Sequence, residues 1–186
     1  MTYFDQLDVL AEDTAEHLVQ IVTSLDEGRI DRAEAVALIA AFLAAANVRA
    51  TVLADLALSA QITAGTGRAV PVLGLTRPDE AARLHRAAST LLERLPPDLE
   101  AAEAQIRRIG RAEPLKAASD ARSDGIAKSA LVEGWIRDRN GDECQLCTWW
   151  WREGRVWPKY HPMPRHTGCV CTQRIVLVER VREVQR

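Results

Sequence analysis

Five residues near the end of the chain have the types and spacing of metal ligands. Two cysteines are separated by two residues, and a histidine with two more cysteines follows a tryptophan-rich segment. Structural zinc is held in a tetrahedron by four thiolate or imidazole ligands, and two ligand pairs can supply it when the intervening chain folds back. We therefore predict a structural Zn²⁺ site. Its candidate ligands are Cys144, Cys147, His166, Cys169 and Cys171.

These five candidates compete for four positions around the metal. Cys169 and Cys171 are alternate residues, and alternate side chains of an extended chain point to opposite faces. A turn at Gly168 could still direct both sulfurs inward, so Cys171 remains a substitute ligand. His161 is a further candidate outside the preferred set. The preferred set is Cys144, Cys147, His166 and Cys169.

Other uses of these cysteines fit the sequence less well. A redox pair is usually accompanied by a βαβ pattern, which we do not find around Cys144 and Cys147. The N-terminus is acidic and lacks the features of an export signal, so we expect a reducing compartment rather than disulfides. A catalytic zinc needs an open coordination position, and only Glu143 and Glu153 are nearby bases. We therefore expect no enzymatic activity.

Most of the remaining chain has the periodicity of helices. Apolar residues recur at steps of three and four from Tyr3 to Leu25, which predicts an amphipathic helix. Asp31 followed by Glu34 resembles a capping box for a second helix, with Gly65 as its C-cap. The predicted helices cover residues 3–25, 31–64, 76–95, 97–109 and 123–135, with a short start from Pro114 through Lys116.

The composition changes after Asn140-Gly141. Residues 148–151 and 156–157 favour two strands joined by a turn at Gly154, and residues 171–178 favour a third strand. The predicted fold is mainly α, a multi-helix body over residues 1–139 with a small zinc-stabilised β-hairpin module and basic tail over residues 140–186. A module this small needs a metal and large aromatic residues to form a core. At least one of its tryptophans should nevertheless be exposed.

Charge is distributed unevenly along a chain whose net charge is −2. Residues 1–30 contain seven acidic residues and one arginine, whereas residues 152–186 contain eight basic and three acidic residues. This asymmetry suits a connector with two different neighbours. The apolar run over residues 35–46 is shorter than the roughly 20 residues that span a bilayer, so we expect a buried helix and no membrane partner.

The C-terminal motifs resemble those of a known family. The pattern comprises Trp135-Ile136-Arg137-Asp138, Cys144-x2-Cys147, Gly154-Arg155-Val156-Trp157 and Pro164-x-His166-x2-Cys169-x-Cys171-Thr172. It is similar to the C-terminal part of phage Mu F-like head morphogenesis proteins, which are minor head (minor capsid) proteins associated with the portal region of tailed bacteriophages. Thr167 and Gly168 stand where this family usually has Pro and Asn, and Val170 replaces an Arg, but the ligand positions are retained.

The resemblance implies a structural role in a virion. The expected partners are the phage portal or major capsid protein and further copies of this chain, with possible contact to packaged DNA. The expected location is the portal vertex region of the capsid, and the host cytoplasm during assembly. Two alternatives remain open. One is a zinc-dependent, nucleic-acid-binding regulator, and the other is a metalloenzyme or toxin, for which we find no HExxH-type pair.

Overall fold

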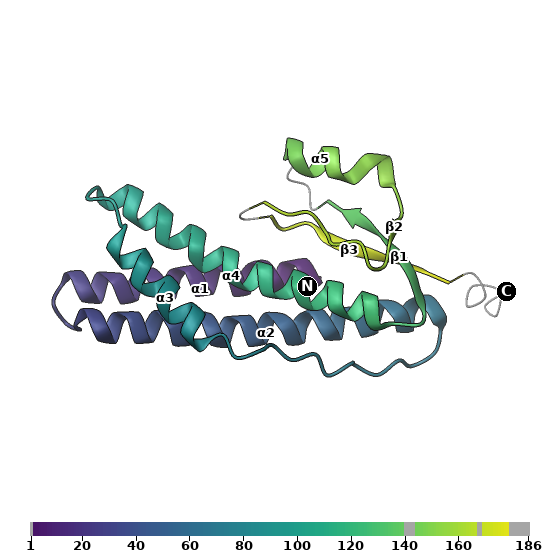
Figure 1. Cartoon of the computed structure of the whole chain (residues 1–186), viewed down its shortest axis with the longest axis horizontal. Helices are drawn as coiled ribbons and strands as arrows, with labels where there is room; N and C mark the ends of the chain where they lie inside the picture. The colour runs from purple at the N-terminus through teal and green to yellow at the C-terminus, as the bar shows by residue number, and fades with distance from the viewer. Residues whose placement is uncertain (1, 140–143, 167–168, 179–186) are drawn as a thin grey trace. The chain divides into compact units, whose positions relative to one another are not determined.

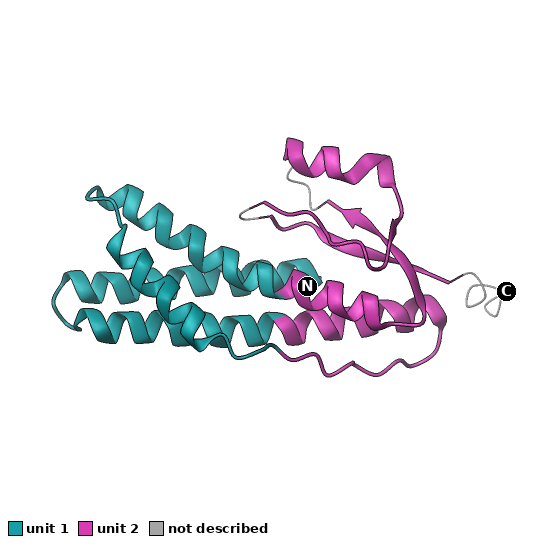
Figure 2. Ribbon diagram, viewed as in Figure 1, with its two compact units in different colours: residues 1–50, 77–117 teal, residues 51–76, 118–186 magenta. Residues whose placement is uncertain are grey.

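The computed structural model describes residues 2–139, 144–166 and 169–178, and this part is mainly helical with a small antiparallel sheet (Figure 1). It divides into two compact units (Figure 2). Unit 1 comprises residues 1–50 and 77–117, and unit 2 comprises residues 51–76 and 118–186. The predicted division after residue 139 adjoins residues outside the described ranges and stays a prediction. The basic tail from Glu179 also lies outside them.

Helix α1 (Tyr3–Asp26) follows the predicted helix closely. Thr2 caps it: its hydroxyl accepts from the Asp5 backbone N–H, while the Asp5 carboxylate accepts from the Thr2 N–H. This reciprocal pair satisfies backbone donors that no helical carbonyl can reach. Residues at three- and four-residue steps, including Leu7, Ala11 and Leu18, are buried, which confirms the apolar stripe.

Helix α2 (Arg32–Thr66) begins as predicted, because the Asp31 carboxylate accepts a hydrogen bond from the Glu34 N–H at 2.8 Å. It ends just beyond the predicted Gly65 cap, and Gly67 follows with φ +66°. Its apolar stretch is longer than residues 35–46. By length and composition alone α2 could cross a membrane, which is weak evidence because core helices of soluble proteins also meet that criterion.

Helices α3 (Ala81–Glu93) and α4 (Leu99–Lys128) differ in their boundaries from the helices predicted for this part of the chain. α3 begins after Glu80 rather than at Thr76. The separate helices predicted over residues 97–109, 114–116 and 123–135 are wrong as far as Lys128. A single continuous helix, α4, covers this part of the chain and contains Pro114. Proline costs a helix one backbone hydrogen bond, and burial of the neighbouring residues Leu115, Ala117 and Ala118 offsets that loss. The core of unit 1 lies between its helices, with Ile39, Leu43 and Leu84 fully enclosed.

A network of ion pairs joins α3 to α4 in unit 1. Arg83 binds Glu80 and Glu113, with its Nη2 2.7 Å from Glu113 Oε2. The pKa of Glu80 falls to about 2, because the Arg77 guanidinium donates a hydrogen bond to its carboxylate and outweighs the effect of burial. The pKa of Glu113 is also lowered: burial raises it, but the paired Arg83 more than compensates.

Unit 1 should therefore lose stability in acid. A carboxyl group with a depressed pKa in the folded state stabilises the fold above its ordinary pKa, and that contribution is lost as pH falls through the depressed value. For Glu80 the loss should occur between pH 4.5 and about 2. We expect Glu80→Gln to remove about 1–3 kcal/mol at pH 7 and to flatten the acid limb of thermal unfolding followed by far-UV circular dichroism. The exposed Glu100→Gln variant is the control, and an equal effect there would contradict the assignment.

The sheet belongs to unit 2 and has the order β2-β1-β3, all antiparallel. Its central strand β1 (Val132–Asp138) replaces the end of the predicted last helix. β3 (Thr172–Leu177) confirms the predicted third strand, and β2 is short (Trp157–Pro158). Trp135 of β1 lies opposite both Trp157 of β2 and Ile175 of β3, so this residue is at the middle of the sheet.

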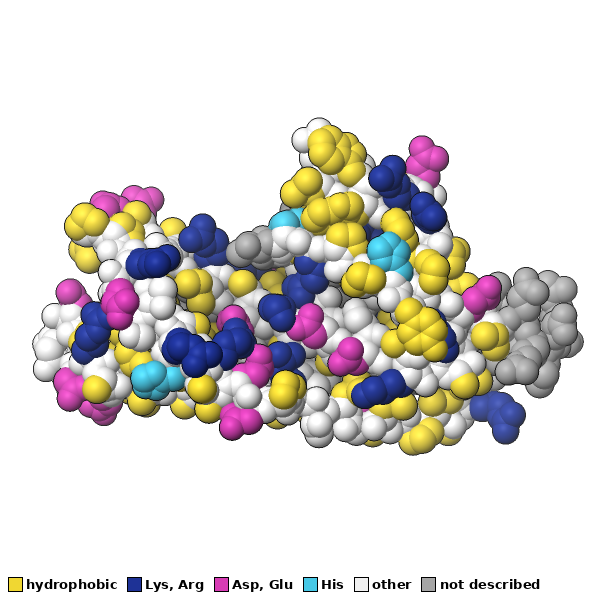
Figure 3. Space-filling model, in the orientation of Figure 1, with side chains coloured by type: hydrophobic (Ala, Val, Ile, Leu, Met, Phe, Trp, Pro, Cys, Tyr) yellow, Lys and Arg dark blue, Asp and Glu magenta, His cyan; other side chains and the backbone are white. Residues whose placement is uncertain are grey.

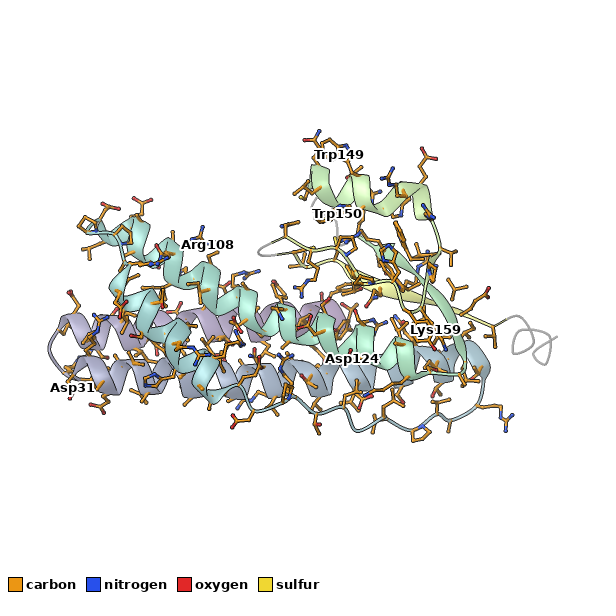
Figure 4. All side chains as sticks on the ribbon, in the orientation of Figure 1. Asp31, Arg108, Asp124, Trp149, Trp150 and Lys159 are labelled. Carbon is orange, nitrogen blue, oxygen red and sulfur yellow. The ribbon has the colours of Figure 1, made fainter. Side chains whose placement is uncertain are left out.

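The predicted strand over residues 148–151 is wrong. This segment forms helix α5 (Gln145–Trp151), followed by a 3₁₀ turn, η1 (Arg152–Gly154), in which Gly154 has φ +82°. The helical period turns successive tryptophans to different sides, so Trp149 lies away from the sheet and Trp150 toward it (Figure 4). Trp150 therefore packs inside unit 2, and Trp149 remains 59% exposed, as expected of at least one tryptophan.

A buried carboxylate fixes the extended segment after α2. Asp55 is buried on α2, and its two oxygens accept hydrogen bonds from the backbone N–H groups of Leu73 and Leu75, each at 3.0 Å. The segment has no regular structure of its own to satisfy these donors. Asp55 therefore holds it against the part of α2 that belongs to unit 2.

Candidate metal centre

The structure brings all five predicted ligand residues together in unit 2. Cys144 and Cys147 lie at the start of α5, His166 lies in the segment after β2, and Cys169 and Cys171 precede β3. The ligand atoms of Cys144, Cys147 and His166 lie within 4.8 Å of one another, and so do the sulfurs of Cys147, Cys169 and Cys171. Cys147 belongs to both groups and is the centre of the cluster.

Two separations match those expected around a single metal ion. Metal–sulfur and metal–nitrogen bonds of about 2.3 and 2.0 Å in a tetrahedron place two sulfurs about 3.8 Å apart and a sulfur and a nitrogen about 3.5 Å apart. The Cys147 and Cys169 sulfurs are 3.6 Å apart, and Cys147 Sγ is 3.3 Å from His166 Nε2. The cluster could therefore hold a metal ion.

Local backbone structure explains how two short motifs form the cluster. Cys144 is the N-cap of α5, and its carbonyl accepts from the Thr148 N–H at 2.9 Å. This first helical turn places Cys147 near Cys144. In the second motif the Cys169 N–H donates to the His166 carbonyl at 3.1 Å, which holds these two residues close together. The predicted turn residue Gly168 lies outside the described residues.

The three sulfurs of Cys147, Cys169 and Cys171 are buried and lie within 4.8 Å of one another, so each affects the pKa of the others. The pKa of Cys169 is lowered to about 4, chiefly because the Cys171 thiol donates a hydrogen bond to it and partly because Arg137 is near. Burial raises the pKa of Cys147 to about 11, and the thiolate at Cys169 raises the pKa of Cys171. A bound cation would favour further deprotonation, since metals bind the thiolate form.

Sequence reasoning missed Arg137, which is 1% exposed on β1. Its Nη1 lies 3.7 Å from Cys147 Sγ and 3.8 Å from Cys169 Sγ, and its Nη2 donates to the Pro164 carbonyl. The guanidinium also lies over the Trp150 ring, 5.3 Å from the ring centroid. The residue was visible within the tryptophan-containing motif of β1, but only the pairing of β1 with β3 places it beside the sulfurs.

The other candidate residues lie elsewhere. His161 packs edge-on against Trp157, with ring centroids 4.3 Å apart, and is in neither ligand group. Glu153 is exposed in η1, and Glu143 lies outside the described residues. His17, far along the chain in unit 1, stacks on Phe42 with centroids 4.6 Å apart. The structure therefore concentrates the candidate ligands in the five residues that the spacing predicts.

Comparison of this chain with protein-family models, with curated proteins and with solved structures finds no match in any of the three.

Proposed function

We propose that this chain is a structural zinc protein of a tailed-bacteriophage head, a minor capsid or head morphogenesis protein associated with the portal region. The convergence of two cysteine groups on Cys147 is the observation that carries the zinc part of the proposal. The C-terminal motif that resembles Mu F-like proteins supports the virion part. We propose no catalytic role, because four protein ligands would leave no open position on the metal.

Zinc is the metal that best suits this donor set. Thiolate and imidazole ligands in a tetrahedron favour zinc over magnesium or calcium, which prefer oxygen ligands. The ion would link α5 to the segment that precedes β3. Its binding free energy would then contribute directly to the folding of this part of unit 2.

Exposed apolar side chains support a role in docking to other head components. In unit 1, Leu38, Phe42 and Val48 are exposed along one side of α2, and in unit 2 Leu146 and Trp149 are exposed on α5. Hydrophobic side chains are visible on the surface around α5 (Figure 3). Exposed apolar groups of this kind often mark protein interfaces. The proposed partners are the portal or major capsid protein and further copies of this chain.

Two measurements test the proposal separately. Elemental analysis of the purified full chain should find zinc at a stoichiometry near one ion per chain, and mass spectrometry should find the chain in purified phage particles. Absence of bound metal would contradict the zinc assignment. Absence from particles, in cells where the chain is made during infection, would contradict the virion role and leave the zinc assignment intact.

Nucleic-acid binding is a second candidate function, favoured by the exposed ring of Trp149, on which a base could stack. Two neighbouring cations are already engaged, because Arg139 lies over Trp151 and Arg155 over Trp157. This function predicts binding of single-stranded DNA that weakens steeply with salt and is lost in Trp149→Ala. Binding independent of Trp149 would argue against it.

A further inference from the structure

The charge of Arg137 bears on which residue completes the metal centre, a question that ligand spacing alone leaves open. Arg137 is 1% exposed, and its contacts among the described residues are two sulfurs, the Pro164 carbonyl and the Trp150 ring, none of which is a carboxylate. Burying an unpaired guanidinium is strongly unfavourable. Its nearest potentially anionic neighbours are the sulfurs of Cys147 and Cys169, both within 3.8 Å of its Nη1.

Two possible ligand sets differ in charge. Zinc with three thiolates and a neutral imidazole carries a net charge of −1, whereas zinc with four thiolates carries −2. The single positive charge of Arg137 neutralises the first set and leaves the second with an uncompensated negative charge in a buried site. Because isolated buried charges are costly, the guanidinium favours the set with one histidine.

We propose, on the basis of the zinc site proposed above, that Arg137 is the buried counter-charge of a three-cysteine, one-histidine centre. His166 is then a ligand together with Cys144, Cys147 and Cys169. Cys171 is a supporting residue beside the sulfurs of Cys147 and Cys169 and does not bind the metal.

The packing around His166 agrees with this assignment. His166 Nε2 is 3.3 Å from Cys147 Sγ, close to the separation of two ligands on one ion. Its ring stacks on Trp150, with centroids 6.3 Å apart and an interplanar angle of 26°. The Arg137 guanidinium lies over the same indole ring. Trp150 thus orients both the imidazole ligand and the counter-charge, which is the role of residues that surround a metal centre without binding it.

The position of Cys171 also agrees with a supporting role. Its sulfur is buried and lies within 4.8 Å of the sulfurs of Cys147 and Cys169. A neutral thiol at that place can donate a hydrogen bond to a ligand thiolate without binding the metal itself.

X-ray absorption at the zinc edge of the full-length protein tests the ligand set. We expect three sulfur neighbours at about 2.3 Å and one nitrogen at about 2.0 Å. Four sulfur neighbours would overturn this inference and leave the proposed zinc site standing. Absence of zinc from the protein would overturn both.

Substitutions test the role of the charge. Arg137→Met should weaken zinc binding about 10- to 100-fold in competition with a chromophoric chelator, and Arg137→Lys should restore part of that loss. Equal affinities for the two variants would show that Arg137 acts through packing and would overturn its role as counter-charge. Cys171→Ser should retain the zinc affinity and the zinc-edge X-ray absorption spectrum of the wild type, whereas Cys144→Ser should lose both. If Cys171→Ser lost its zinc, the assignment of Cys171 would be wrong.

Discussion

Removal of the metal should unfold the C-terminal part of unit 2 and leave the helical signal of unit 1 largely intact. Three of the ten residues that form the core of unit 2 are cysteines of the cluster, so the same side chains serve as core and as candidate ligands. α5 is only seven residues long, and isolated helices of that length are unstable in water. We therefore expect α5 to unfold when the ion is removed. The apparent zinc-binding free energy of small structural sites, about 10–16 kcal/mol, is large enough to decide whether this region folds.

The chain carries a convenient probe for this experiment. All five tryptophans lie in unit 2, at positions 135, 149, 150, 151 and 157. Treatment with a strong chelator should shift tryptophan emission to longer wavelength, with a much smaller loss of helical signal in far-UV circular dichroism. Added zinc should reverse the shift. Cys147→Ser should resemble the stripped protein without chelator, and an unchanged emission spectrum after complete metal removal would contradict a structural role for the metal.

Substitution of Trp135 by Ala should produce the second large effect. Trp135 is completely buried on the central strand, stacks on Trp157 with centroids 6.0 Å apart, and donates from Nε1 to the His161 carbonyl at 3.2 Å. Truncation would create a large cavity and leave the partly buried His161 carbonyl without its donor. We expect a loss of about 3–5 kcal/mol in the stability of unit 2.

This loss should be measured by denaturant unfolding at saturating zinc, followed by the emission of the remaining tryptophans. Trp135→Phe should recover part of the packing but not the hydrogen bond, and its stability should fall between those of Trp135→Ala and the wild type. The exposed Trp149→Ala variant is the matched control and should change stability by less than about 0.5 kcal/mol. Equal losses at positions 135 and 149 would contradict the buried role of Trp135.

Gly134 of β1 lies against the backbone of β2. A Cβ at this position would lie 2.3 Å from the Trp157 carbonyl oxygen, which is backbone and cannot move aside without disrupting β2. The absence of a side chain at residue 134 therefore allows β1 and β2 to approach closely. This contact brings Trp157 against Trp135 and covers one side of the core next to the Cys/His cluster.

The sequence by itself determined α1, the start of α2 and the identity of the candidate ligands. α1 and the start of α2 are set by local signals, namely the Thr2 and Asp31 caps and the three- and four-residue apolar period. The ligand residues are likewise local, because each pair lies within one turn of chain. Such features depend on neighbours in sequence and can be predicted without knowing the fold.

Only the tertiary structure decided the conformation of residues 129–139 and 144–157 and the surroundings of the cluster. Three consecutive tryptophans have high strand propensity, yet they form α5, because the turn that begins at Cys144 directs Cys147 and Trp150 into the core. Residues 132–138 form a strand because β2 and β3 supply partners on both sides. The same pairing buries Arg137 against the two sulfurs. Hydrogen bonds between distant segments and a buried charge have no local pattern, so their effect emerges only when the chain is folded.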